Sequence, residues 1–381
     1  MAAQLELLTT DTLEAISENR DFLTKQLITY IGNKRNLLDF IANGLNIVKH
    51  RLGKDRLDTF DVFAGSGVVS RFLKQFSTIL YTNDLEEYSS LINECYLTNK
   101  EEFNYGEFAE LYSEITWRLE NEPLKKGFIA EMYAPEDDRN IKSGERVFYT
   151  RRNAQYIDTA RQLIDDVPEK FRKYLLAPLL SEASIHANTS GVFKGFYKNT
   201  DTGIGQFGGK NRDALFRIMG EIRIPFPIFS NYSCDYRVYN GDSNELCEEI
   251  PEVDIAYLDP PYNQHPYGSN YFMLNTILSY KKPQMTSEVS GIPDNWKRSQ
   301  YNKINYAYTA LAELVGKVKA KFLIISFNSE GFISQEEMTQ LLRSFGKMTV
   351  LETKYNTFRG SRNLVNREIH VKEYLYLLEK R

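Results

Sequence analysis

The sequence of 381 residues has only three cysteines and four histidines, and both kinds are scattered along the chain. Cys95, Cys234 and Cys247 have no short spacing, and together with the histidines they form no pattern typical of a zinc site. Isolated cysteines are typical of buried thiols in a reducing compartment. We therefore expect a cytoplasmic protein without a structural metal.

The chain also lacks a long apolar run, a secretory signal and an excess of positive charge. No apolar run approaches the roughly 20 residues that a membrane span needs, and residues 1–20 are acidic and polar. We therefore expect no association with a membrane. The formal net charge is -4, so any surface that binds nucleic acid must be local. With 42% hydrophobic and 26% charged residues, the composition is that of a globular protein.

Strands and helices alternate in the first and last parts of the chain. Helical spacing follows the first two apolar runs, at residues 68–76 and in a segment that ends at Leu97. The last two runs are expected to be antiparallel strands at the edge of the sheet. This alternation predicts a doubly wound α/β sheet. The strands expected from apolar runs are residues 59–64, 78–82, 254–258, 321–327, 349–355 and 371–378.

The middle of the chain does not continue this alternation. Residues 101–235 contain long polar stretches, several glycines and many aromatic side chains, which favour an inserted, partly helical region. We therefore predict that residues 25–100 and 236–381 form one α/β domain interrupted by this insertion. Residues 1–24 are interpreted as a polar N-terminal lead-in.

A glycine turn closes the first expected strand, in the sequence DVFAGSG at residues 61–67. Ligands of open α/β sheets bind at the carboxyl ends of strands, and glycines let the backbone approach them closely. Asp84 follows the second strand, where a carboxylate can accept hydrogen bonds from both hydroxyls of a ribose. The glycines alone could form an ordinary tight turn. Because the third glycine of a dinucleotide motif and a GKS or GKT loop are missing, an adenosine-type ligand such as S-adenosylmethionine fits better than NAD or ATP.

The DPPY segment at residues 259–262 directly follows the third expected strand. Its prolines favour a rigid, extended platform. The Asp259 carboxylate and the Pro260 carbonyl can accept both hydrogens of an exocyclic amine and so direct its lone pair towards a methyl donor. Tyr262 offers a flat face to a base that is flipped out of a duplex. A turn after a strand is the alternative, and the nearby glycine loop and ribose carboxylate weigh against it.

The order of these motifs resembles that of the Dam-like, alpha-group adenine-N6 DNA methyltransferases. The resemblance covers roughly residues 24–381, and it includes stretches similar to the methylases of type II and type IIS restriction-modification systems, at residues 186–196, 259–277 and 357–375. It implies a Rossmann-like methyltransferase fold with a mixed seven-stranded sheet, in which the insertion is a largely helical target-recognition region. It also implies S-adenosylmethionine as cofactor, double-stranded DNA as substrate and a cognate restriction endonuclease as a candidate partner.

The same resemblance assigns candidate cofactor contacts. Tyr30 and Lys34 would reach the methionine part of the cofactor, and Asp61 would lie near its amino group. Asp242 would contact the cofactor's adenine. Lys34 could instead be a solvated charge, Asp61 a loop cap and Asp242 a turn residue. The full set of cofactor-binding candidates is Tyr30, Lys34, Asp61, Phe63, Gly65, Gly67, Asp84 and Asp242, and the catalytic candidates are Asp259, Pro260 and Tyr262.

Positive charge gathers in part of the insertion. Residues 139–223 contain 15 Lys or Arg residues and 9 Asp or Glu residues, and phosphate contacts are mostly made by Lys and Arg. Each of these cations could also be an ordinary solvated charge. We expect a monomer, because one cofactor and one base suffice for each turnover. The DNA-binding candidates are Arg151, Arg152, Lys194, Lys198, Lys210 and Arg212, together with Arg359 and Arg362 between the two late strands.

Two other functions remain open from the sequence. The same chemistry could act on the N4 amine of cytosine, on RNA or on a protein amide, or the chain could be a non-catalytic DNA-binding or cofactor-sensing module. Methylation of cytosine C5 is disfavoured because that reaction needs a nucleophilic cysteine, usually after proline, and no Pro-Cys pair is present. Asp259 at the first position of the DPPY segment is more typical of adenine enzymes, so we predict an adenine-N6 DNA methyltransferase.

Overall fold

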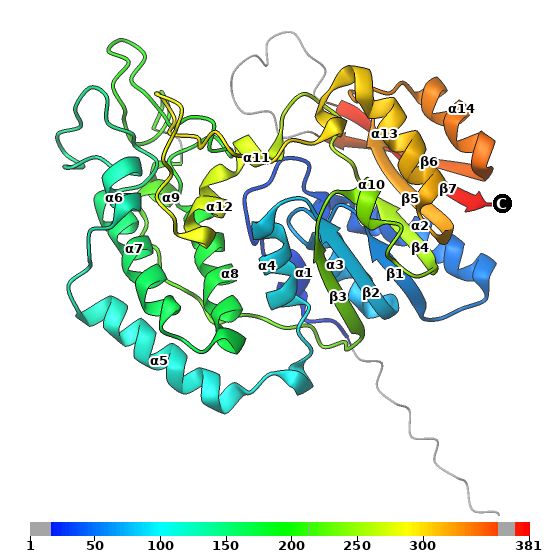
Figure 1. The fold of residues 1–381 in the computed structure, drawn as a ribbon, viewed down its shortest axis with the longest axis horizontal. Coiled ribbons are helices and arrows are strands. Elements are labelled where there is room, and N and C mark those ends of the chain that lie inside the picture. Colours follow the sequence, from blue (N-terminus) through cyan, green and yellow to red (C-terminus); the bar gives the residue numbers. More distant parts are fainter. Residues whose placement is uncertain (1–16, 213, 357–369) are drawn as a thin grey trace, which may run out of the picture.

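A seven-stranded sheet forms one lobe of the molecule and a group of helices forms the other (Figure 1). The computed structural model describes residues 17–212, 214–356 and 370–381. Its strands lie in the order β3-β2-β1-β4-β5-β7-β6. They are β1 (Leu57–Asp61), β2 (Ser77–Asp84), β3 (Asp235–Asn240), β4 (Val253–Leu258), β5 (Ala320–Asn328), β6 (Gly346–Asn356) and β7 (His370–Lys380).

The sheet is mixed, as the sequence predicted. Strands β1 to β5 pair in parallel, and β7 is antiparallel to both of its neighbours, β5 and β6. The prediction that both late strands lie at the edge was therefore half right, because β7 lies inside and only β6 is at the edge. Strand β3 was not predicted, because it is an edge strand whose side chains are all at least partly exposed and whose sequence therefore has no apolar run.

Helices cover both faces of the sheet. Alternation along β4 and β5 sends Ile255 and Ile324 towards α2 (Leu38–Leu52) and α3 (Val68–Leu73), and Ala256 and Leu323 towards the opposite face. The short helix η2 (Lys74–Phe76) extends α3. Side chains that alternate between two buried faces produce the continuous apolar runs seen in the sequence. The opposite face is covered by α10 (Ser243–Leu246), α13 (Ile304–Lys317) and α14 (Gln335–Phe345).

The helical lobe has its own apolar core, and that core includes residues outside the expected insertion. Phe272 of α12 packs against the rings of Tyr133 and Phe148 of the insertion, with centroids 5.9 and 6.1 Å apart. That residues 101–235 form a separate insertion stays a prediction. Helix α12, which follows the DPPY segment in the chain, packs into the core of the helical lobe and so connects the α/β domain to it. The helices of this lobe are α5 (Tyr105–Asn121), α6 (Phe128–Tyr133), α7 (Arg151–Asp165), α8 (Glu169–Ile185), α9 (Leu215–Met219) and α12 (Phe272–Ser279).

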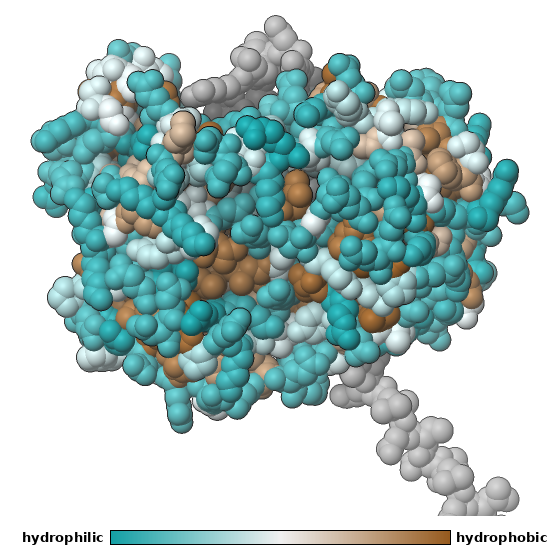
Figure 2. Space-filling model, viewed as in Figure 1, coloured by the Kyte–Doolittle hydropathy of each residue, from teal (hydrophilic) through white to brown (hydrophobic). Residues whose placement is uncertain are grey.

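Helix α4 (Glu87–Tyr96) lies at the junction of the two lobes, because it contacts both β2 and α8. Figure 2 shows apolar side chains gathered along this junction. None of the helices in the described residues has the length and hydrophobicity needed to cross a bilayer. The remaining short helices are α1 (Arg20–Thr24), α11 (Tyr267–Asn270), η1 (Lys34–Leu37), η3 (Lys100–Glu102) and η4 (Gln300–Asn302).

The direction of strand addition reverses between β1 and β4. Strands β2 and β3 add on one side of β1, and β4 and β5 add on the other. In open α/β sheets, the loops at the carboxyl ends of two such strands separate and leave a crevice that binds ligands. The glycine turn follows β1 and the DPPY segment follows β4, so the fold brings both motifs to this crevice.

Candidate active site

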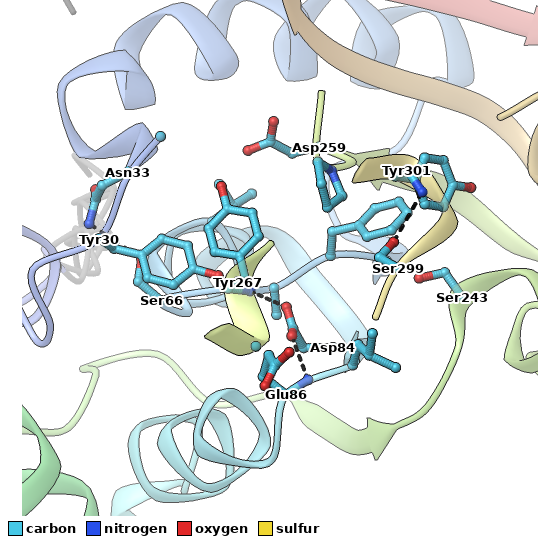
Figure 3. A pocket seen from close by; sticks show the side chains of 18 of the residues that line it. Tyr30, Asn33, Ser66, Asp84, Glu86, Ser243, Asp259, Tyr267, Ser299 and Tyr301 are labelled. Carbon is cyan, nitrogen blue, oxygen red and sulfur yellow. Dashed lines mark hydrogen bonds between the residues drawn. The ribbon is translucent and has the colours of Figure 1, made fainter. Parts of the chain in front are cut away.

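A cavity of about 850 Å³, measured out to its open mouth, lies at the carboxyl ends of β1 and β4. Figure 3 shows Asp84 and Asp259 on different sides of the cavity, with the Tyr267 ring between them in that view. The sequence-predicted residues that line the cavity are Tyr30, Lys34, Phe63, Gly65, Asp84, Asp242 and Asp259.

The two glycines of the turn have different neighbours. Both have positive φ, 52° at Gly65 and 74° at Gly67, a region that favours glycine. A Cβ atom on Gly65 would lie 2.9 Å from Cε1 of Tyr30, whereas one on Gly67 would lie 2.9 Å from Oδ1 of Asn93. Gly65 therefore allows Tyr30 to approach the cavity wall. Gly67 allows α4 to pack closely and does not line the cavity.

Asp84 is fixed by backbone amides at the end of β2. Its Oδ2 accepts a hydrogen bond from Gly65 N at 2.7 Å, and its Oδ1 accepts one from Glu86 N at 2.8 Å. Burial raises the pKa of Asp84 to about 6 and that of Glu86 to about 7. Both carboxylates line the cavity (Figure 3). They can accept hydrogen bonds from ligand hydroxyls or attract a ligand cation.

Three tyrosine rings connect the N-terminal motif to the chain after the DPPY segment. The Tyr30 ring stacks on Tyr267 with centroids 4.9 Å apart and on Tyr271 with centroids 4.8 Å apart. The buried Tyr271 hydroxyl also accepts a hydrogen bond from Ile31 N at 2.7 Å. At the same motif, Asn33 donates to Ser66 Oγ of the glycine turn at 3.3 Å. Segments far apart in the sequence therefore form one wall.

Asp259 forms an ion pair with Lys34, a residue more than 200 positions earlier in the chain. Lys34 Nζ lies 3.2 Å from Asp259 Oδ1 and 2.6 Å from Glu373 Oε1 on β7. Burial raises the pKa of Asp259 to about 6, and Lys34 acts against this rise. Burial acts to lower the pKa of Lys34, but the two carboxylates outweigh it and hold that pKa well above its usual value. One buried ammonium therefore forms ion pairs with two carboxylates.

The rest of the DPPY segment divides between two cavities. Asp259 and Pro261 line the first cavity, and Pro260 does not. Tyr262 lines a second cavity that adjoins the first at residues 30–34. The Tyr262 ring meets Phe327 edge-on, with centroids 5.8 Å apart. The ring thus lies next to the cavity around Gly65 rather than inside it.

The remaining cofactor candidates occupy distinct positions. Asp61 is fully buried and does not line the cavity, and its Oδ2 accepts a hydrogen bond from Ser70 at 2.6 Å. Its Oδ1 has no hydrogen-bond partner among the described residues, and burial raises the pKa to about 7. Asp242 lines the cavity and caps α10 by accepting from Asn244 N at 2.9 Å. Phe63 lines it as well and meets Tyr301 edge-on at 5.2 Å.

Several residues at the site were missed from the sequence. Glu86, Lys297 and Tyr301 line the first cavity, and Glu373 lines the second. Lys297 and Tyr301 lie in a stretch without a recognisable motif, so no signal pointed to them. Glu373 falls in one of the stretches that carried the family resemblance, and this was the only signal for it. No side chains in the described part of the chain are arranged to bind a metal ion.

The candidate DNA-binding cations fall into two groups. Arg151 and Arg152 form ion pairs with Glu136 at 3.3 Å and Glu221 at 3.2 Å, so their charges are already partnered. The other four are exposed on the insertion, and the structure gives them no ion pair with a described residue; they are Lys194, Lys198, Lys210 and Arg212. Arg359 and Arg362 lie outside the described residues.

Comparison with known proteins agrees with this arrangement. The model of the D12 class N6 adenine-specific DNA methyltransferase family matches residues 30–341. The chain is 29% identical to Type II methyltransferase M.NlaIII of Neisseria lactamica over 363 residues, which cover 93% of this chain and 99% of that protein. It is 30% identical to Modification methylase LlaI of Lactococcus lactis subsp. lactis over 346 residues, covering 87% of this chain and 51% of that protein. The chain, with its glycine turn and DPPY segment at the same crevice, therefore belongs to the D12 class N6 adenine-specific DNA methyltransferase family.

Proposed function

We propose that this chain methylates the N6 amine of adenine at specific sites in double-stranded DNA, with Asp259 as the residue that holds the amine. The observation that carries the proposal is the position of Asp259 on the wall of the cavity that also contains Gly65 and Asp84. A carboxylate at the end of β4 thus shares one cavity with a ribose-type site at the end of β2. A nucleoside cofactor and a target amine can both reach this space.

The residues of the cavity fit S-adenosylmethionine. Asp84 offers a fixed carboxylate to the ribose hydroxyls, and Asp242 offers an acceptor to an adenine amine. Phe63 and Tyr301 provide apolar walls. Asp61 is fully buried and does not line the cavity, so we propose no direct contact between its carboxylate and the cofactor. When bound, the cofactor would supply an electrophilic methyl group on its sulfonium sulfur.

The chain's own part of the chemistry is to position and polarise the target amine. Asp259 has a pKa of about 6, so above that pH it is ionised and accepts a hydrogen bond from the amine. A second acceptor, the Pro260 carbonyl, would take the other hydrogen and favour a pyramidal nitrogen. Tyr262, in the adjoining cavity, would stack on the flipped base, which is worth roughly 1–3 kcal/mol. The methylated, positively charged amine loses its proton easily, so no strong base is required.

The wider role follows from the relatives. Two relatives that this chain matches over nearly their whole length are named type II methyltransferases. We assign this chain the same role, the modification of DNA in a restriction-modification system. A cognate endonuclease is the expected partner. Three buried free thiols fit the cytoplasmic setting predicted from the sequence. A monomer remains the expected state.

The test is to incubate the protein with S-adenosylmethionine carrying a labelled methyl group and with double-stranded DNA, and then to digest the DNA to nucleosides. Label in N6-methyladenine supports the proposal. Label in N4-methylcytosine, or no label in DNA with label in RNA or protein, contradicts it. Sequencing with methylation detection on DNA from cells that express the chain then gives the recognition sequence.

A further inference from the structure

Lys34 interacts with two carboxylates and lies closer to one of them than to the other. Its Nζ donates a short hydrogen bond to Glu373 Oε1 at 2.6 Å and lies farther from Asp259 Oδ1, at 3.2 Å, where it also pairs with that carboxylate. The side chains of Lys34 and Glu373 are 4% and 3% exposed, so water cannot easily replace either partner. Ser326 Oγ donates a further hydrogen bond to Glu373 Oε1 at 2.8 Å. Glu373 is therefore fixed from two sides.

This arrangement affects what Asp259 can offer to a substrate. A cation near a buried carboxylate keeps it ionised. An ammonium that approached that carboxylate more closely would compete more strongly for the lone pairs that an adenine amine must use. Holding Lys34 closer to Glu373 keeps the ammonium beside Asp259 and limits that competition.

We propose that Glu373 is a positioning residue for methyl transfer: it holds the Lys34 ammonium beside Asp259 and so leaves the Asp259 lone pairs available to the target amine. This inference rests on the proposed role of Asp259. It predicts that removing the Glu373 charge has two linked consequences. Lys34 turns fully to Asp259, which lowers the rate of transfer, and Asp259 becomes harder to protonate.

Other charged or titratable groups also lie near Asp259, and their influence on its pKa must be separated from that of the Lys34 position. Glu373 acts as a like charge that raises the pKa of Asp259, so its removal and the closer approach of Lys34 act in the same direction. Tyr257, Tyr262 and Tyr267 adjoin the Asp259–Lys34 pair. Burial raises the pKa of the Tyr257 and Tyr267 hydroxyls well above its usual value, so they stay neutral near neutral pH. Asp61, Asp84 and Glu86, whose pKa values burial raises to about 7, about 6 and about 7, titrate in the same range. Asp61 is the group whose charge the experiment removes, because it interacts with Asp259 directly, whereas Lys297 is the cation that acts on Asp84 and Glu86.

The experiment measures single-turnover methyl transfer between pH 5 and 9 at saturating cofactor and DNA, for the wild type and Glu373→Gln. We expect the acid limb to move to lower pH by about half a unit or more, and the rate at pH 8 to fall about tenfold. The dissociation constants for cofactor and DNA should change by less than about threefold. Both variants are also measured in the Asp61→Asn background. Because Lys297, and not Lys34, is the cation that acts on Asp84 and Glu86, the part of the limb that moves with Glu373→Gln there belongs to Asp259.

Two further variants test the direction of the pH shift and control for the loss of a glutamate charge elsewhere on the sheet. Lys34→Met removes the cation, so the acid limb should move to higher pH, opposite to Glu373→Gln. Glu352→Gln makes the same change on β6, where Glu352 is exposed and pairs with Lys372 at 3.5 Å, and it should leave the profile unchanged. If Glu373→Gln does not fold, Glu373→Asp keeps the charge but shortens its reach. Its acid limb should then move down by a smaller amount.

A rate at pH 8 that is unchanged while the acid limb moves down overturns the inference, because loss of the Glu373 charge alone lowers the pKa of Asp259. An acid limb that stays in place or moves up when Glu373 is changed overturns it as well, even if the rate falls. Failure of the proposed function has a different signature. If Asp259→Asn retains the wild-type rate, the role of Asp259 is wrong. If Asp259→Asn is inactive while the limb of Glu373→Gln is unmoved, only the role of Glu373 is wrong.

Discussion

The sheet lobe and the helical lobe differ in where their functional candidate cations lie: buried between carboxylates at the site, and exposed on the insertion. At the site, Lys34 is buried between two carboxylates, whereas Lys198, Lys210 and Arg212 of the insertion are exposed with no ion pair to a described residue. A cation that keeps a catalytic carboxylate ionised works best when it is fixed away from water. Cations that meet DNA phosphates must instead be available to replace counterions. The difference predicts that changes at the site alter rate and that changes in the insertion alter DNA affinity.

The largest expected effect tests the site side of this comparison. Asp259→Asn preserves the size of the side chain but replaces one acceptor oxygen with a donor group. We expect the rate of methyl transfer to fall by about 10²–10³, with the cofactor dissociation constant changed by less than about threefold. Single-turnover kinetics and calorimetric titration measure the two quantities. A collapse of cofactor binding together with activity would contradict the assigned role.

The next effect concerns the wall that Tyr30 and the glycine turn form. In Gly65→Ala the new Cβ would lie 2.9 Å from Tyr30 Cε1, so we expect cofactor affinity to fall about tenfold or more. Strain at positive φ should also cost about 1–2 kcal/mol of unfolding free energy. Gly53→Ala is the matched control, because Gly53 has φ +64° and no atom within 4 Å of the added Cβ. The control should lose stability but keep its affinity, and equal affinity loss in both would refute the explanation.

A smaller effect tests the insertion side. The triple variant Lys198→Ala, Lys210→Ala, Arg212→Ala should weaken DNA binding and reduce the salt slope of log K by about 1 for each cation that contacts a phosphate. Cofactor affinity should not change. Arg151→Ala is the comparison, because Arg151 pairs with Glu136 at 3.3 Å and donates to Ala130 O at 3.0 Å. It should lower the melting temperature and leave the slope unchanged, and the reverse pattern would show that the two groups were misassigned.

The smallest effect is a pH dependence of stability at the site. Burial raises the pKa of Asp61 to about 7 from 3.8, so the folded state binds this proton more tightly than the unfolded state. Its burial therefore costs stability above pH 7, and this cost declines as pH falls and disappears below about pH 4. Asp61→Asn should raise the melting temperature by a few degrees at pH 8 and hardly at all near pH 4. Thermal unfolding in the absence of cofactor measures this, and a pH-independent difference would contradict the cause.

The sequence predicted much of the fold because buried strands leave a local signal. Strand β4 is buried along its whole length, and its apolar run was visible without coordinates. Edge strand β3 was invisible because its exposed side chains need not be apolar. In the same way, the glycine turn and the DPPY segment were found because backbone shape constrains their residue types. Glu86 and Lys297 were missed because any loop can carry a charged residue.

The sequence by itself determined the order of the elements, the two motifs at strand ends and the class of ligand that such motifs suit. Only the tertiary structure decided which charges meet: Lys34 could be placed in a motif, but not between Asp259 and Glu373, 225 and 339 positions away. The tertiary structure likewise decided that Arg151 forms an ion pair with Glu136, whereas Lys210 is exposed. The reason is that local preferences act over a few residues, whereas electrostatic interactions depend on distance and burial, which the chain sets only when it is folded.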